Sequence, residues 1–155
     1  MRLLSTSWVL VTSSWVVALA IFVGCTPTTG ESIVVAASGE PQLVGAVWQL
    51  SAYRDARGNM LPVLPGTQPT ALFESTGFVT GSGGCNAYST VFQSVATTLS
   101  ITGPITTTHS LCEQSVMDQE AVYFIALAQT ASYRFESDRL ALIQSGGAPL
   151  AEYGH

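Results

Sequence analysis

A glycine-rich run at residues 81–88, GSGGCNAY, holds a cysteine and an asparagine among its glycines. Glycine has no side chain, so a run of this kind lets the backbone bend tightly or approach another group closely. Four kinds of chemistry use such a run: phosphate binding, catalysis by a thiol, metal binding and a structural crosslink between two segments. Each of them needs further residues, so the rest of the chain decides among the four.

Phosphate binding needs a lysine and a hydroxyl residue behind the glycines, at the start of a helix. This chain contains no lysine, and the glycines continue as CNAYST, which is typical of a strand. The five cationic residues are arginines and stand against ten acidic residues, which gives a formal net charge of −5. A basic patch for a phosphate backbone is therefore not expected, and we predict no nucleic-acid partner.

Catalysis by a thiol would pair Cys85 with a base, and His109 is the only histidine besides the C-terminal His155. A lone cysteine and a lone histidine form a weak pattern, because many unrelated proteins contain both. A zinc site built from Cys85, His109 and Cys112 lacks the paired spacing of structural zinc sites. We therefore predict no catalytic residue, no metal and no cofactor, and keep a thiol-dependent enzyme as an alternative.

The first 24 residues have the composition of an export signal. After Arg2 the chain is uncharged and mostly apolar as far as Gly24. Its end, FVGC at residues 22–25, resembles a lipobox, in which the cysteine receives a lipid before cleavage. We predict a lipoprotein signal peptide over residues 1–24 and an acyl lipid such as palmitate on Cys25. The alternative is an uncleaved transmembrane anchor, for which the 16 residues from Val9 to Gly24 are short.

Both alternatives place the rest of the chain outside the cytoplasm, tethered to a membrane. With a lipid on Cys25, that membrane is the outer membrane where the host has one, and otherwise the outer face of the plasma membrane. Cleavage leaves two further cysteines, Cys85 and Cys112, in a compartment where thiols can oxidise. They can form a disulfide if their Cα atoms lie within about 7 Å. Two buried reduced thiols are the alternative.

Residues 25–42 are small and polar, with two prolines, and predict a flexible tether. Folded sequence begins near Leu43, where residues 43–53 predict a strand with Trp48 and Leu50 on one face. Further strands are predicted from alternation and from turn residues between them. The segments concerned read TALFE, GFVTG, TTLSIT, PITTT, SYRFE, RLALIQ and LAEY.

One segment has helical periodicity instead, and it predicts an amphipathic helix over about residues 115–130. Ser115 is expected to cap this helix, with Asp118 in its first turn. The fold class predicted from these elements is α+β, a mostly antiparallel sheet or partly open barrel with one helix. The apolar stripe of the helix is expected to consist of Val116, Met117, Ala121, Tyr123, Phe124, Leu127 and Ala128.

The order of these motifs resembles the META domain family, which includes the HslJ-like lipoproteins of bacterial envelopes. The resemblance rests on GSGGCNAYSTVF, then THSLC, then Glu120 within the predicted helix, then SYRFESDRLALIQSGGAPLAEY. It covers about Leu43 to Tyr153 and begins with a W-x-L strand at Trp48. We predict the domain over residues 43–155.

The chain departs from the family pattern at three positions. Thr90 stands where a glycine is usual, Phe92 where a tyrosine is usual, and Ser110 where a methionine is common. The resemblance implies a compact β domain with one helix, often anchored as a lipoprotein and associated with stress or envelope phenotypes. No established enzymatic activity accompanies it. It therefore implies a non-enzymatic accessory of the envelope that acts through contacts with an envelope protein.

A second hypothesis is a small-molecule binding module near Tyr88, Phe92 and Glu120. The glycines, among them Gly83 and Gly84, are expected to allow positive φ or a close approach at the bend. We expect the motif to be architecture, a bend and a crosslink, with a core of Trp48, Phe73, Tyr88, Phe124 and Leu142.

Three polar residues complete the motif. Asn86 is expected to hydrogen-bond the backbone of the bend, and Thr108 opens the Thr-x-x-x-Cys half of the pattern. Glu120 is expected at the rim, paired with Arg134 or Arg139. The alternative for Glu120 is a polar group that closes a small pocket.

Overall fold

A computed structural model of the chain describes residues 42–155. The predicted signal peptide, Cys25 and the tether before Gln42 lie outside the described residues. Within this part, no helix has the length and apolar character needed to cross a membrane.

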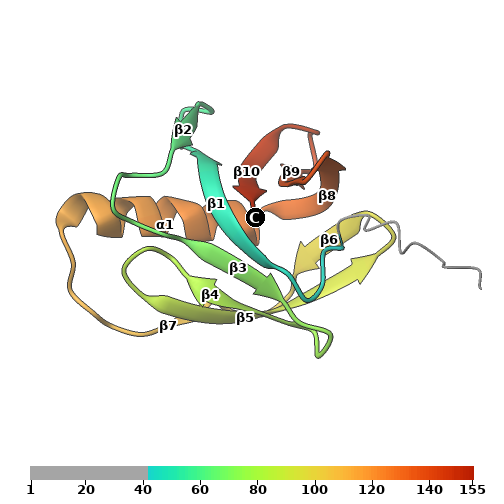
Figure 1. Cartoon of the computed structure of the whole chain (residues 1–155), viewed down its shortest axis with the longest axis horizontal. Helices are drawn as coiled ribbons and strands as arrows, with labels where there is room; N and C mark the ends of the chain where they lie inside the picture. The colour runs from blue at the N-terminus through green and yellow to red at the C-terminus, as the bar shows by residue number, and fades with distance from the viewer. Residues whose placement is uncertain (1–41) are drawn as a thin grey trace, which may run out of the picture. The chain divides into compact units, whose positions relative to one another are not determined.

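The described chain contains one helix among ten strands (Figure 1). Every strand pairing is antiparallel. The elements are β1 (Val47–Arg54), β2 (Met60–Pro62), β3 (Thr70–Phe73), β4 (Phe78–Ser82), β5 (Ala87–Val95), β6 (Thr98–Ile101), β7 (Thr106–Thr107), α1 (Gln114–Ala128), β8 (Thr130–Glu136), β9 (Arg139–Gln144) and β10 (Pro149–Gly154).

Eight of the strands form a closed ring. Their order is β1, β3, β4, β5, β6, β8, β9 and β10, and β10 pairs again with β1, so that Leu50 lies opposite Tyr153. β2 extends beside the end of β1, and β7 pairs with the start of β5. The predicted antiparallel α+β barrel is confirmed. The expectation that it is partly open is wrong, because the first and last strands close it.

Side chains point alternately into and out of the barrel along its strands, and the inward ones fill its interior. In β1, Trp48 and Leu50 point inward while Val47 and Gln49 are exposed, as predicted. The pairing of β1 with β10 shifts register after Leu50, and such a bulge changes which residues face inward, so that Tyr53 is buried as well. The side chains that fill the interior come from most strands of the ring and from α1, and they include Trp48, Phe73, Val79, Leu99, Leu127, Leu140, Leu142 and Tyr153.

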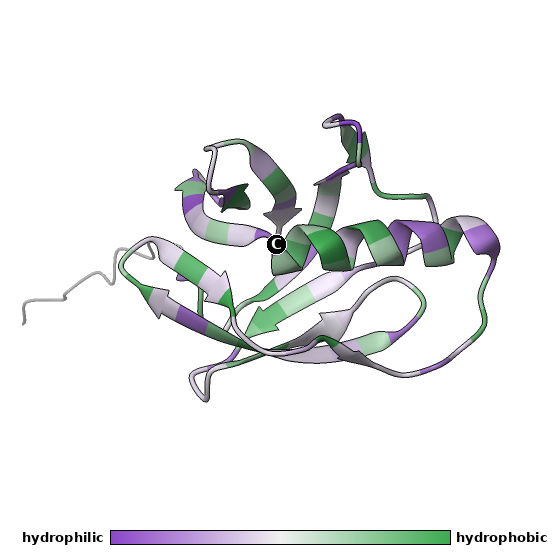
Figure 2. Ribbon diagram, turned by 180° about the vertical axis from the view of Figure 1, so that it is seen from behind, coloured by the Kyte–Doolittle hydropathy of each residue, from purple (hydrophilic) through white to green (hydrophobic). Residues whose placement is uncertain are grey.

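The helix α1 packs against β1, β6 and β10. Figure 2 shows that its apolar residues gather towards its C-terminal end and its polar residues towards its N-terminal end. The predicted helix is confirmed with slightly different ends. Ser115 is not the cap, because the helix begins at Gln114 and the capping position is Glu113, whose side chain makes no capping bond. Asp118 lies beyond the first turn rather than in it.

The buried face of α1 differs from the predicted stripe. Ala121 and Ala128 are exposed, and Phe124 is half-buried rather than core. The helix is rotated so that two polar side chains face the barrel, because both find hydrogen-bond partners there. Its buried residues are Gln119, Glu120, Tyr123, Ala126 and Leu127.

Candidate functional site

The glycine-rich motif forms the turn between β4 and β5. Gly83 N–H donates to the carbonyl of Asn86 across 2.7 Å, and Gly84 has a φ of +112°, which favours glycine. A Cβ on Gly83 would lie 2.5 Å from Glu120 Oε2 and 2.7 Å from the ring of Phe124. A side chain at Gly83 would therefore push α1 away from the turn, so the predicted close approach is a contact with this helix.

The carboxylate of Glu120 receives three hydrogen bonds from this turn. Oε2 accepts from Asn86 N at 2.6 Å and from Cys85 N at 3.1 Å, and Oε1 accepts from Asn86 Nδ2 at 2.8 Å. Glu120 is only 7% exposed. A buried carboxylate needs donors of this kind, and the turn supplies them. Glu120 thus fixes the helix to the β4–β5 turn.

The expected pairing of Glu120 with an arginine at the rim is wrong. Arg134 pairs with Glu136 at 2.6 Å, and Arg139 pairs with Glu152 at 3.0 Å. Both ion pairs lie on the exposed surface of the barrel, where such pairs contribute little to stability.

Asn86 joins the turn to a second loop. Its Oδ1 accepts from Thr108 Oγ1 at 3.0 Å and from Ser110 N at 2.7 Å, and Thr108 Oγ1 accepts in turn from Ala87 N at 3.2 Å. The predicted bond from the Asn86 side chain to the backbone of its own bend is not made. The side chain instead bonds the loop that follows β7, because its amide oxygen faces that loop. Thr108 thereby belongs to the same network.

Cys85 and Cys112 form a disulfide, with their Cα atoms 6.0 Å apart. The bond connects the β4–β5 turn to the segment that leads into α1. The predicted pairing is present in the structure. In this form neither sulfur is a thiolate, so Cys85 cannot act as a nucleophile with the exposed His109 as its base. No group of three His, Cys, Asp or Glu side chains suited to a metal occurs within residues 42–155.

Gln119, the residue before Glu120, was not singled out from the sequence. Its Oε1 accepts from Leu64 N at 2.7 Å, and its Nε2 donates to Thr67 Oγ1 at 3.0 Å. It is 2% exposed. The two adjacent side chains therefore fix α1 to two separate loops. Little in the sequence signals this role, because Gln119 stands between Asp118 and Glu120 in the polar half of the helix.

Three tyrosine hydroxyls meet behind this network, inside the barrel. Tyr88 and Tyr123 have their hydroxyl oxygens 2.9 Å apart, and Tyr153 donates to Tyr123 across 3.2 Å. Tyr88 also donates to the carbonyl of Thr70 at 3.0 Å. Burial raises the pKa of all three phenols well above the ordinary value. The folded barrel therefore favours their neutral forms.

Tyr88 gives a test of this burial at alkaline pH. Because its folded-state pKa is raised above the ordinary 10.0, its contribution to stability is complete below pH 10 and is lost as pH rises towards the folded pKa. At about pH 11, Tyr88 should account for a loss of about 1.4 kcal/mol. Unfolding at neutral and alkaline pH should show a smaller alkaline loss in Tyr88→Phe than in the wild type. Equal losses in both would mean that this phenol is not protected in the folded state.

The residues proposed for small-molecule binding do not share a cavity. Tyr88, Phe92 and Glu120 are each less than 10% exposed, and the barrel interior around them is filled. A shallow depression of about 290 Å³ lies outside the ring over residues 87–89 and 106–108. A second cavity, of about 480 Å³, lies between α1 and the loop after β1. Neither is lined by Phe92 or Glu120.

The fold and the site together define a class: small closed antiparallel barrels in which one helix is fixed by a crosslinked, hydrogen-bonded turn. A family model described as the META domain matches residues 41–154, which is more than half of the chain. The chain belongs to the META domain family.

Solved structures show the same fold. A protein from Burkholderia xenovorans, determined by NMR, has a TM-score of 0.58 and 25% identity, and the alignment covers 72% of this chain and 82% of that one. A DUF4847 family protein from Bacteroides vulgatus, determined by crystallography, has a TM-score of 0.50 and 16% identity, with 73% and 94% covered. No curated protein matches the chain.

Proposed function

We propose that the chain is a non-enzymatic accessory protein of the cell envelope, exported, anchored by a lipid on Cys25, and active through contacts with another envelope protein. The proposal that the protein is not an enzyme rests on one observation: the polar groups of the motif are used in bonds within the fold. Glu120, Asn86 and the two cysteines are committed to bonds within the fold. Groups that are buried and bonded in this way serve architecture rather than a substrate.

Contacts with a protein are supported by the outer face of the barrel. Phe78 on β4 lies opposite Val91 on β5 and is 46% exposed, and Val47 on β1 is 55% exposed. Phe78 and Val91 lie on the neighbouring strands β4 and β5, and Val47 lies on β1, which is separated from β4 by β3. Exposed apolar side chains that gather on one face are typical of surfaces that bind other proteins. We infer that this face, formed by Val47, Phe78 and Val91, carries the contact.

One experiment tests anchoring and contact together. Full-length chain with a photo-crosslinking residue at position 78 is expressed with a palmitate analogue, alone and with Cys25→Ser. The chain with Cys25 should carry the label, fractionate with membranes and form a defined adduct with one envelope protein. Cys25→Ser should lose all three, because the lipid holds the chain at the membrane.

A crosslinker at the exposed Leu61, which lies on β2 away from this face, is the matched control and should form no such adduct. Label on the Cys25→Ser chain would contradict the lipid anchor. Equal adducts from positions 61 and 78, or none from either, would contradict the contact face.

A further inference from the structure

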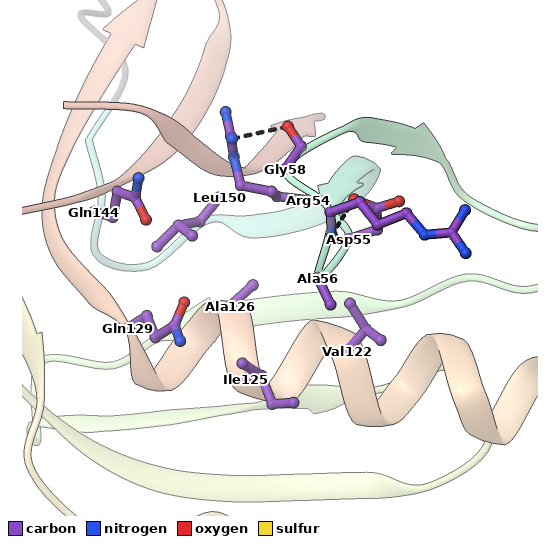
Figure 3. Close-up of a pocket in the computed structure, with 11 residues that line it drawn as sticks. Arg54, Asp55, Ala56, Gly58, Val122, Ile125, Ala126, Gln129, Gln144 and Leu150 are labelled. Carbon is purple, nitrogen blue, oxygen red and sulfur yellow. Dashed lines mark hydrogen bonds between the residues drawn. The ribbon is translucent and has the colours of Figure 1, made fainter. Parts of the chain in front are cut away.

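The cavity beside α1 lies apart from the motif. It has a volume of about 480 Å³ and opens between α1, the loop of residues 54–58 and β10 (Figure 3). None of the glycine, cysteine or asparagine residues of the β4–β5 turn lines it. Cavities of roughly 300 to 1,000 Å³ are the size that holds small organic ligands. The fold therefore contains a candidate binding site that its motif does not explain.

One wall of the cavity is apolar. Val122, Ile125 and Ala126 line it from α1, and Leu150 lines it from β10, facing the helix in Figure 3. Ile125 is 56% exposed although it is a large aliphatic side chain. An alkyl chain laid along this wall would remove Ile125 from water, which is favourable at about 25 cal/mol for each Å² of apolar surface covered.

The opposite wall carries a guanidinium without a carboxylate partner among residues 42–155. Arg54 donates from Nε to the carbonyl of Pro149 at 2.5 Å. It also donates from Nη1 to the carbonyl of Gly58 at 2.8 Å (Figure 3). These bonds to neutral carbonyls hold the side chain in place and leave its Nη2 donors and its charge uncompensated. A held guanidinium of this kind suits a carboxylate, which it can bind through two parallel hydrogen bonds.

Within the described residues, the one acidic side chain that lines the cavity, Asp55, is already hydrogen-bonded within its own loop. Asp55 accepts from Arg57 N, Asn59 N and Asn59 Nδ2 at 2.7 to 3.2 Å. The hydrogen bond from the Asn59 backbone is the main cause that lowers the pKa of Asp55, so this carboxylate stays ionised and bonded to the loop. With Arg54 and Arg57 against Asp55, residues 54–58 carry a positive formal charge in a chain of net charge −5.

Two amides complete the polar lining. Gln129, which follows α1, and Gln144, at the end of β9, line the cavity on the same side in Figure 3. No hydrogen bond joins either side-chain amide to another residue within the range 42–155. Both can therefore donate to a ligand oxygen without breaking a bond of the fold.

We propose that this cavity binds a small amphipathic carboxylic acid. Its carboxylate binds Arg54, and its alkyl chain lies on α1 between Val122 and Ala126. The apolar wall favours ligands with an alkyl chain, and the unpaired guanidinium of Arg54 favours ligands with a negative charge. The inference goes beyond the proposed accessory function and does not depend on the lipid on Cys25.

Hexanoate is the probe, and the test uses the full chain in lipid nanodiscs with labelled arginine. The Arg54 Nε signal should shift saturably with hexanoate. Acetate should bind about tenfold or more weakly, because each buried methylene is worth about fourfold in affinity. Hexylammonium, with the same chain and the opposite charge, should not displace hexanoate.

Two variants locate the site. Ile125→Glu replaces an exposed side chain on the apolar wall and should weaken hexanoate binding about tenfold or more, through lost contact and repulsion of the carboxylate. Arg54→Gln should abolish binding, with the emission of buried Trp48 reporting whether the barrel is still folded. Arg134→Gln, an exposed arginine on β8, is the matched control and should bind as the wild type does.

The absence of a saturable Arg54 shift would overturn the proposal. So would equal binding of hexylammonium, or wild-type affinity in Ile125→Glu. If Arg54→Gln unfolds the barrel, the affinity of Ile125→Glu for hexanoate alone tests whether the cavity is the binding site.

Discussion

Glu120→Ala should lower the free energy of unfolding of residues 42–155 by about 3 to 5 kcal/mol. The substitution removes the acceptor for Cys85 N, Asn86 N and Asn86 Nδ2. Each buried donor left without a partner costs roughly 1 to 3 kcal/mol. The effect should exceed that of an ordinary surface change, which is usually within about 0.5 kcal/mol.

Chemical unfolding followed by Trp48 fluorescence measures this loss, because Trp48 is fully buried and is the only tryptophan within residues 42–155. Glu113→Ala is the matched control, since Glu113 is exposed at the start of the same helix and caps nothing with its side chain. The double variant Asn86→Ala/Glu120→Ala should lose less than the sum of the two single losses, because these residues bond each other. Additive losses would show that the network does not act as a unit.

Removal of the disulfide should cost about 3 to 4 kcal/mol. Cys85 and Cys112 are 27 residues apart in sequence, and closing a loop of this length restricts the unfolded chain by about that amount on the loop-entropy model. The variant Cys85→Ser/Cys112→Ser should therefore unfold at a clearly lower denaturant concentration. For a domain with a total stability of about 5 to 15 kcal/mol, this loss is a large fraction.

The wild type under reductant is the control for this variant, and the two should unfold at the same midpoint. Titration of the oxidised wild type should find no reactive thiol within residues 42–155 before reduction and two after it. Two reactive thiols before reduction would contradict the crosslink and favour the thiol-dependent alternative. A stability difference below about 1 kcal/mol would mean that the loop is ordered by its hydrogen bonds alone.

Local patterns were sufficient for most elements. RLALIQ was predicted as a strand and forms β9, and the short glycine loop between TALFE and GFVTG joins β3 to β4. Alternation also identified the inward side of β1 at Trp48 and Leu50. β2 was missed, because its three residues lie in a proline-bearing stretch that reads as a loop.

The candidate site was only partly predictable, for a physical reason. Turn glycines and a cysteine pair are visible in sequence, but the partners of Glu120 and Gln119 lie 34 and 55 residues away. Hydrophobic periodicity assumes that the buried face of a helix is apolar. Here long-range hydrogen bonds bury two polar side chains, so the periodicity was only partly right: Tyr123 and Leu127 are buried as predicted, but the buried face of α1 also contains Gln119 and Glu120.

The pairing of β1 with β10 sets the order of events during folding. Gln49 lies opposite Gly154, so β1 can pair with β10 only after all the other strands of the ring have been synthesised. Contacts between residues so distant in sequence slow folding, because a long segment must be ordered before they form. A chain truncated before Pro149 should therefore remain an open sheet, and the closed barrel should form in a single late step once β10 is present.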